Sequence, residues 1–457
     1  MRDGEWYDPY RKHVEGWLKA PSSADPREFR DHVRMGLAQL QMDPALDHSP
    51  LVGDEVLNGR PGVIKKLNLK TGAGLGIKSK LQAVAVGPDG VYRLREEYQH
   101  QYNSLERQFH RCAYDEALVG IACLKDETLK VGKNPRTIIV LPMLVNLLVR
   151  AKLVPILACL RGASAVGINV YGESYHGMIE RMVRFGPLRC LFTADARGFD
   201  KDERGPIVDM MLREFCESLV EKGVVTLAEA RELYCLLWYV WHCVVVVGGD
   251  AFLAQQMASG VAITALLNSL IMYLLCVCCL AEMWRFKGEM SWYPRLVIPW
   301  HYGDDSLVAL APELARVYNP LIVVEVARRL GFTLTGADKS SLPELVSLAE
   351  ADFLKRRPRF HEVLGRYVGA LEWASIYKSL AFVIPSDSMP ISDQYEEIAS
   401  NSLYEAWLWG PAAFDDHRRF LLEYVAQEGW GELPRSEDCA RRFALEDVVV
   451  SSDDEGV

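Results

Sequence analysis

The chain has 457 residues, of which 50% are hydrophobic and 25% are charged, a composition typical of folded globular proteins and unlike that of disordered or fibrous ones. Its formal net charge of -10 argues against a nucleic-acid binder, because phosphate contact usually shows as a basic surface. The 11 cysteines lack zinc-ligand spacing and no secretory leader opens the sequence, so we expect reduced thiols in a cytosolic compartment.

Charge is distributed unevenly along the chain. Residues 1–60 carry mixed charge and several prolines without a sustained period, so we predict an irregular segment with short helices. The acidic end from Ser451 is predicted to be disordered. Two basic stretches are either solvated faces or the walls of a basic channel inside an acidic shell. Their members are Lys65, Lys66, Lys70, Lys78 and Lys80, then Lys355, Arg356, Arg357 and Arg359.

Three short apolar runs, each of strand length, lie close to aspartates. Residues 188–194 (LRCLFTA) predict a buried strand that delivers Asp195 at its end. The runs 296–300 and 306–310 flank Gly303-Asp304-Asp305, whose glycine suits a hairpin turn with both aspartates at its tip.

The longest apolar run, 261–280, is long enough to cross a bilayer. It contains Thr264 and Asn268, which stand four apart and therefore share a helical face, and an asparagine near a membrane centre would need a polar partner. No basic flank anchors either end. We therefore expect a buried core helix with one polar face, and no transmembrane segment.

Phosphoryl transfer from a nucleoside triphosphate requires neutralisation of charge, which enzymes achieve with two divalent cations roughly 3.5–4 Å apart. Mg²⁺ prefers carboxylate oxygens. Asp195 facing Asp304 and Asp305 would supply them from a rigid scaffold. Taken alone, an adjacent pair of aspartates is more often a solvated turn.

Several segments, taken in order, resemble the polymerase of positive-strand RNA viruses, most closely the picornavirus-like group. Each motif is individually weak, and their order makes the set specific. The chain departs from the family pattern at Thr128-Leu129, where relatives usually have Leu-Arg. The motifs are Lys125-Asp126-Glu127, Gly132 to Arg136, Asp195 to Asp200, Ser259 to Ser269, Tyr302 to Asp305, Ala337 to Ser340, and Phe353 to Arg356.

The resemblance implies catalytic and binding roles. Asp195 and Asp304 would ligate two Mg²⁺ ions, with Mn²⁺ as an alternative, and Asp305 would be a secondary ligand or a support. Lys339 resembles the family's general acid, which protonates the departing pyrophosphate. The incoming triphosphate would bind Lys125, Lys133 and Arg136, and RNA would bind Lys355 and Arg356.

A second group of residues would contact the ribose. Asp200 and Asn268 can hydrogen-bond each other and present an acceptor and a donor to a 2′-hydroxyl. Ser259, Gly260 and Thr264 belong to the same nucleotide-binding set, in which Ser259 and Thr264 would support them. A reverse transcriptase usually places a bulky aromatic where Asp200 stands, so the polar residue favours ribonucleotides. The other interpretation is a polar helix face or a cap.

We expect an α+β right-hand polymerase, with fingers, a palm that carries an antiparallel sheet, and a helical thumb. The thumb prediction rests on Leu371, Trp373, Ile376 and Leu380, which recur at helical spacing. The predicted division is fingers with the N-terminal segment over 1–186, palm over 187–220 and 256–364, a fingers insertion over 221–255, thumb over 365–450 and the disordered tail over 451–457.

The expected activity is RNA synthesis from ribonucleoside triphosphates on an RNA template, for viral genome replication and transcription. The alternatives are a reverse transcriptase and a catalytically inactive, polymerase-like RNA-binding scaffold. The implied partners are an RNA template and primer, a protein primer and other viral replication proteins. The expected location is the host cytoplasm, at membrane-associated replication complexes.

Overall fold

The computed structural model describes residues 10, 25–112, 119–125, 135–161, 164–186, 189–199, 205–247, 249–284, 292–385, 389–428 and 433–445.

The N-terminal part is built from short elements around a docked helix. Asp25 caps the 3₁₀-helix η1 (Pro26–Glu28), and α2 (Arg30–Gln39) follows directly. Arg30 and Arg34 of α2 bind Glu214 of α8 (Gly205–Glu221), and this pairing compensates the burial of that carboxylate. The smaller elements here are β1 (Gln41–Met42), α3 (Glu55–Asn58), α4 (Lys80–Ala83), β2 (Val84–Val86), β3 (Tyr92–Leu94), α5 (Glu96–His110) and β6 (Leu160–Arg161).

A four-stranded sheet joins segments that are far apart in the sequence. Its order is β5 (Thr137–Val140), β4 (Val119–Leu124), β8 (His242–Val247) and β9 (Asp250–Gln255), with β4 and β8 parallel. The chain leaves β5 through the apolar helix α6 (Met143–Ala158) and returns through α9 (Leu227–Trp241). The predicted fingers insertion requires the chain to return to the N-terminal part in this way. The predicted subdomain boundaries stay a prediction.

The central sheet is antiparallel throughout. Its order is β10 (Val297–Tyr302), β11 (Asp305–Leu310), β7 (Leu191–Arg197) and β12 (Thr333–Thr335), and β13 (Leu345–Val346) also pairs with β7. The predicted end of the strand at Asp195 is wrong, because β12 pairs with β7 as far as Arg197. Asp195 is therefore held between two neighbouring strands rather than at a free strand end.

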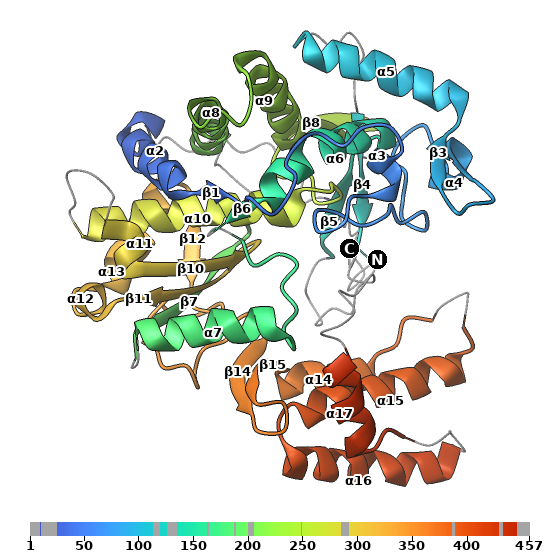
Figure 1. The fold of residues 1–457 in the computed structure, drawn as a ribbon, viewed down its shortest axis with the longest axis vertical. Helices are drawn as coiled ribbons and strands as arrows, with labels where there is room; N and C mark the ends of the chain where they lie inside the picture. The colour runs from blue at the N-terminus through green and yellow to red at the C-terminus, as the bar shows by residue number, and fades with distance from the viewer. Residues whose placement is uncertain are drawn as a thin grey trace, which may run out of the picture.

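Helices cover both faces of the central sheet (Figure 1). One face packs against α10 (Thr264–Met283) and α13 (Pro320–Arg329), and the other against α7 (Glu173–Phe185). By length and composition α10 could cross a membrane, with a mean hydropathy of 2.1, but 83% of that stretch is buried inside the protein. The predicted buried core helix is thus confirmed. The short helices α11 (Tyr293–Leu296) and α12 (Pro312–Ala315) flank β10 and β11.

The C-terminal helices form a separate lower part in Figure 1, joined to the rest by the hairpin of β14 (Arg356–His361) and β15 (Arg366–Leu371). The helices are α14 (Trp373–Ala381), α15 (Ile391–Trp407), α16 (Pro411–Glu428) and α17 (Ser436–Leu445). They share a core with the hairpin, in which Trp407 stacks on Phe443. The predicted helical position of Leu371 is wrong, because it pairs with Arg356 at the end of β15.

Candidate active site

Three aspartates meet at one end of the central sheet. Asp195 of β7 and Asp305 of β11 are directly opposite in the antiparallel register, so their side chains project from the same face. Asp304 lies in the two-residue turn between β10 and β11. Its carbonyl accepts a hydrogen bond of 3.2 Å from the Ala196 amide. The predicted hairpin is confirmed, although Asp305 is already the first residue of β11 rather than part of the tip.

The turn that carries Asp304 is held by α10. Gly303 has a φ of 60°, the left-handed region that tight hairpin turns require and glycine adopts without strain. Its amide donates to the Ser269 hydroxyl at 2.9 Å, and that hydroxyl donates to the Ala265 carbonyl at 2.7 Å. We did not predict this role for Ser269. The available signal was a small polar residue next to Asn268 within an apolar helix.

The carboxylates repel one another. Like charges directly opposite in a sheet are destabilising, and Asp305 shows the consequence. Burial, followed by the neighbouring Asp304 and Asp195, raises the pKa of Asp305 to about 7, and Lys339 offsets part of the effect. This end of the sheet therefore favours positive charge.

Lys339 supplies positive charge to the cluster. Its Nζ lies 2.6 Å from Asp195 Oδ2. Burial opposes the charged form of Lys339, but the hydrogen bond to Asp195 and the nearby aspartates outweigh it and raise the pKa of this lysine. The geometry brings Lys339 to the predicted site, and its role as an acid stays a prediction.

The residues next to Lys339 in the motif 337–340 form the turn that presents this lysine. Asp338 accepts hydrogen bonds from the Ser341 and Ser340 amides at 2.8 and 2.9 Å, and these bonds hold the pKa of Asp338 well below its usual range. They close a turn in which Lys339 has a φ of 64°, a strained conformation for a residue with a side chain. Asp338 therefore builds the turn, and Lys339 faces the site.

The predicted ribose-contacting residues lie on the loop 256–263 and the start of α10. The Ser259 hydroxyl accepts a hydrogen bond from the Ile139 amide at 3.3 Å. The Thr264 hydroxyl is 2.8 Å from the Val261 carbonyl and so braces the loop. Asn268 follows one turn later and is 6% exposed. The predicted Asp200 lies outside the described residues.

Gly260 is required by the closeness of β5. Its amide donates to the Ile139 carbonyl at 3.0 Å, and a Cβ on Gly260 would come to 3.0 Å from that same oxygen. A larger residue would push the loop away from the strand.

Two of the predicted triphosphate-binding residues are brought together. The Lys125 amide donates to the Arg136 carbonyl at 2.8 Å, which extends the pairing of β4 with β5 by one step. Arg136 is exposed. Lys133, the third predicted residue, lies outside the described residues.

Comparison with known proteins decides the family. A sequence model described as viral RNA-dependent RNA polymerase matches residues 1–426. The chain belongs to this family of viral RNA-dependent RNA polymerases. Among solved structures, the sicinivirus 3Dpol RNA-dependent RNA polymerase has a TM-score of 0.75 and 17% identity, covering 97% of this chain and 90% of that one. The predicted right-hand polymerase fold is confirmed.

Similar proteins include the RNA1 polyproteins of several viruses. That of Cowpea mosaic virus (strain SB) is 26% identical over 94% of this chain and 24% of the polyprotein. The RNA1 polyprotein of Tomato ringspot virus (isolate raspberry) is 29% identical over 71% of this chain and 15% of the polyprotein. That of Cycas necrotic stunt virus is 24% identical over 88% and 18%. The chain thus spans less than a quarter of each of these relatives.

The two predicted RNA-binding residues of this chain differ in their surroundings. Lys355 is exposed on a tight turn with a φ of 59°. The Arg356 guanidinium lies 2.8 Å from Glu405 and 3.0 Å from the Tyr171 hydroxyl, and its side chain is 15% exposed. An RNA contact by Arg356 does not fit this geometry, because its donors already join the hairpin to α15. Lys355 stays a predicted contact.

The three clustered aspartates suit divalent cations in type and charge. Among the described residues, no three Asp, Glu, His or Cys side chains are already arranged as a metal site. The carboxylates nevertheless offer the oxygen donors that Mg²⁺ prefers, and an ammonium now neutralises Asp195. The repulsion between Asp195 and Asp305 is the kind that a bound cation relieves.

Proposed function

We propose that this chain synthesises RNA on an RNA template by adding ribonucleoside monophosphates, from the triphosphates, to a primer strand. The observation that carries the proposal is the placement of Asp195, Asp304 and Asp305 at one end of the central sheet. Phosphoryl transfer depends on positioning and neutralisation of charge, and carboxylates on paired strands provide a rigid base for both.

Viral RNA polymerases generally use divalent metal ions, and the side chains of Asp195 and Asp304 would hold two Mg²⁺ ions with support from Asp305. Bound there, the ions would neutralise phosphate charge and activate the primer 3′-hydroxyl. For this, Asp195 must part from Lys339, whose Nζ is 2.6 Å away. The freed lysine would then donate a proton to the departing pyrophosphate.

The remaining site residues would bind the nucleotide. Lys125 and Arg136, which adjoin at the ends of β4 and β5, would neutralise the triphosphate together with Lys133. Asn268 and Asp200 would hydrogen-bond the ribose 2′-hydroxyl, the group that distinguishes RNA from DNA. Their polarity favours an RNA polymerase over a reverse transcriptase.

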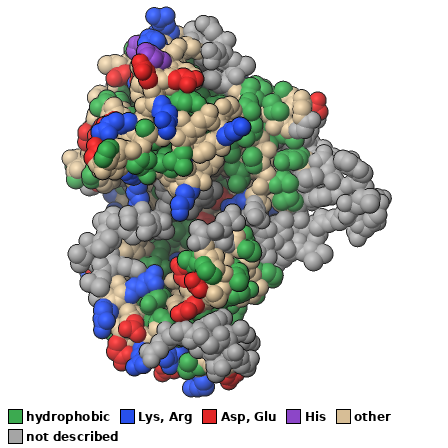
Figure 2. Space-filling view, turned by 90° about the vertical axis from the view of Figure 1, so that its right-hand side faces the viewer, with side chains coloured by type: hydrophobic (Ala, Val, Ile, Leu, Met, Phe, Trp, Pro, Cys, Tyr) green, Lys and Arg blue, Asp and Glu red, His purple; other side chains and the backbone are tan. Residues whose placement is uncertain are grey.

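The surface offers a path for RNA. Figure 2 shows an indentation between the two parts of the molecule, with Lys and Arg side chains on both rims. Template and primer would lie along this indentation, with exposed Lys355 among the phosphate contacts. Base pairing, rather than the protein, would select each nucleotide.

The cellular setting is also a proposal. Because the relatives are RNA1 polyproteins, we propose that this polymerase acts beside other viral replication proteins. From the resemblance to the picornavirus-like group, we also propose a protein primer and membrane-associated replication complexes in the host cytoplasm.

Primer extension with Mg²⁺ tests the function. The wild-type protein should extend an RNA primer with ribonucleotides, and Asp304→Ala should reduce the rate roughly 10³-fold or more, because it removes a ligand of the reacting centre. The exposed Asp416 of α16, paired with Arg419, gives the control Asp416→Ala, which should match wild type.

Each alternative gives a distinct result. A preference for deoxyribonucleotides would indicate a reverse transcriptase. RNA binding without extension would indicate a scaffold. Equal activity of Asp304→Ala and wild type would refute the assigned site.

A further inference from the structure

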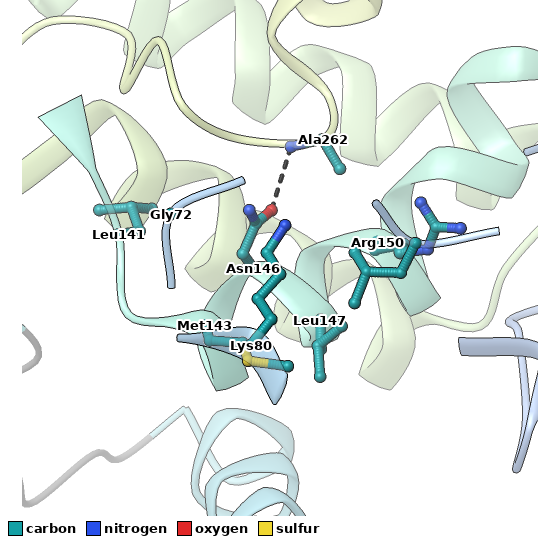
Figure 3. A pocket seen from close by; sticks show the side chains of 9 residues that line it. Gly72, Lys80, Leu141, Met143, Asn146, Leu147, Arg150 and Ala262 are labelled. Carbon is teal, nitrogen blue, oxygen red and sulfur yellow. Dashed lines mark hydrogen bonds between the residues drawn. The ribbon is translucent and has the colours of Figure 1, made fainter. Parts of the chain in front are cut away.

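We propose that Asn146 of α6 is a positioning residue that fixes the loop 256–263, and with it the ribose-contacting residues. This inference rests on the proposed function. The Asn146 carboxamide holds the loop at two points: Nδ2 donates to the Gly260 carbonyl at 3.2 Å, and Oδ1 accepts from the Ala262 amide at 3.0 Å. Figure 3 shows the side chain directed at this backbone. One side chain thus pairs with the loop as a neighbouring strand would.

The other contacts of the loop hold different points. On its N-terminal side, the Ser259 hydroxyl and the Gly260 amide bond to the backbone of Ile139. At its C-terminal end, the Thr264 hydroxyl bonds to the carbonyls of Ala258 and Val261. Asn146 binds the Gly260 carbonyl and the Ala262 amide, two backbone groups that these contacts do not hold.

Side-chain packing fixes only part of this segment, because Val261 is buried in the core while Ala262 is not. A small cavity lies beside Asn146, and its lining includes Lys80, Leu141 and Ala262 (Figure 3). Ala262 itself is exposed. At Ala262, where the loop faces the cavity, hydrogen bonds rather than van der Waals contacts hold the backbone.

The position of Asn146 in α6 is explained by these bonds. The helix is mainly Leu and Val, with most of its residues buried, and asparagine has a lower helix propensity than leucine. Arg150 follows one turn later on the same face, and its guanidinium donates to the Val56 carbonyl at 2.9 Å. Both polar residues of this face therefore hold the backbone of other segments.

Two substitutions separate positioning from packing. Asn146→Leu keeps the branch at Cγ and the number of side-chain heavy atoms but removes both hydrogen bonds, and it should raise the KM for ribonucleotides about tenfold. The preference for ribonucleotides over deoxyribonucleotides should fall with it. Asn146→Asp keeps the acceptor, and its protonated form also restores the donor. The activity of this variant relative to wild type should therefore rise as the pH falls from about 8 to about 6.

The experiment combines single-nucleotide incorporation kinetics with hydrogen exchange of a peptide covering residues 256–266. Wild type is compared with Asn146→Leu, Asn146→Asp and the control Asn103→Leu on α5, where Asn103 accepts a bond from Gln99. Faster exchange in the loop, a raised KM and a reduced sugar preference in Asn146→Leu alone would support the proposal. Should that variant fail to fold, the pH response of Asn146→Asp decides.

Two results with Asn146→Leu would overturn the proposal. One is unchanged hydrogen exchange in the loop, and the other is faster exchange with the wild-type sugar preference, which would mean a structural role alone. An inactive wild-type protein would refute the proposed function instead, and the exchange measurement would still decide whether Asn146 holds the loop.

Discussion

Asp305 illustrates how a buried carboxylate is destabilised by two neighbouring carboxylates. Burial and the nearby Asp304 and Asp195 raise its pKa to about 7. The folded protein therefore keeps a proton that the unfolded chain releases near pH 4, the ordinary range of aspartate. The sign follows from linkage: without divalent cations, this group lowers the stability of the fold as the pH rises from about 4 to about 7.

The affinity for Mg²⁺ should consequently depend on pH. Protons compete with the cation for Asp305, so below about pH 7 the apparent affinity should fall by up to about tenfold per pH unit, and above that value it should level off. Titration calorimetry with Mg²⁺ between about pH 5.5 and 8 measures this. Asp305→Asn should bind more weakly and lose most of the pH dependence. A wild-type affinity that is flat over this range would show that Asp305 takes no part in binding.

For single residues, the sequence predicts the candidate catalytic side chains better than the residues that hold the surrounding backbone in place. Asp195, Asp304 and Lys339 stand in recognisable motifs, and the structure brings them together. Ser269 and Asn146 were missed because each bonds to backbone groups far away in the chain, 34 residues for Ser269 and at least 114 for Asn146. A hydrogen bond to a distant backbone leaves no periodic pattern in the sequence.

Among the elements, the hairpin β14–β15 links the two parts of the molecule. Arg356 of β14 binds Glu405 of α15, and both side chains are largely buried, at 15% and 17% exposure. The Trp409 indole donates to the Leu371 carbonyl at 2.8 Å. The hairpin is therefore fixed to the C-terminal helices through an ion pair and a neutral hydrogen bond.

Breaking this ion pair on one side should be costly. Arg356→Met leaves the Glu405 carboxylate without its guanidinium, and we expect a loss of about 3 kcal/mol in the free energy of unfolding. The double variant Arg356→Met/Glu405→Leu should recover much of that loss, because no buried charge remains. Denaturant unfolding of both variants measures the difference.

Arg359→Met is the matched control. Arg359 is exposed and lies 4.8 Å from the Trp409 ring, so its loss should cost less than about 1 kcal/mol. A similar cost for Arg356→Met would mean that the buried pair does not hold the hairpin.

Element prediction succeeded where the local pattern agreed with the tertiary contacts. The run 261–280 gave a buried helix, and the runs on both sides of Gly303 gave paired strands. It failed where a partner strand decided the outcome: β12 extends β7 beyond Asp195, and Arg356 draws Leu371 into β15. In the sequence, β12 lies more than 100 residues from β7, and Arg356 lies about 15 residues from Leu371. A local sequence window does not contain partners so far away.

For the whole molecule, the net charge does not describe the local charge at the surface indentation. The formal charge of -10 describes the complete chain, while Figure 2 shows Lys and Arg side chains on both rims of the indentation. Length and composition also gave no sign that strands from 119–140 and 242–255 would form one sheet. Only the order of the motifs pointed to that arrangement, through the resemblance to a known fold.

RNA binding should accordingly depend strongly on salt despite the acidic chain. Arg357 and Arg359 of β14 are exposed next to Lys355. If they contact phosphates, the double variant Arg357→Ala/Arg359→Ala should reduce the slope of log affinity against log salt by about 1.5, with little change in sequence preference. Arg328→Ala on α13 should leave the slope unchanged, because Arg328 is already neutralised by Glu325 at 2.8 Å. Fluorescence anisotropy with a primed RNA template at several salt concentrations measures these slopes. An unchanged slope in the double variant would place the RNA path away from the hairpin.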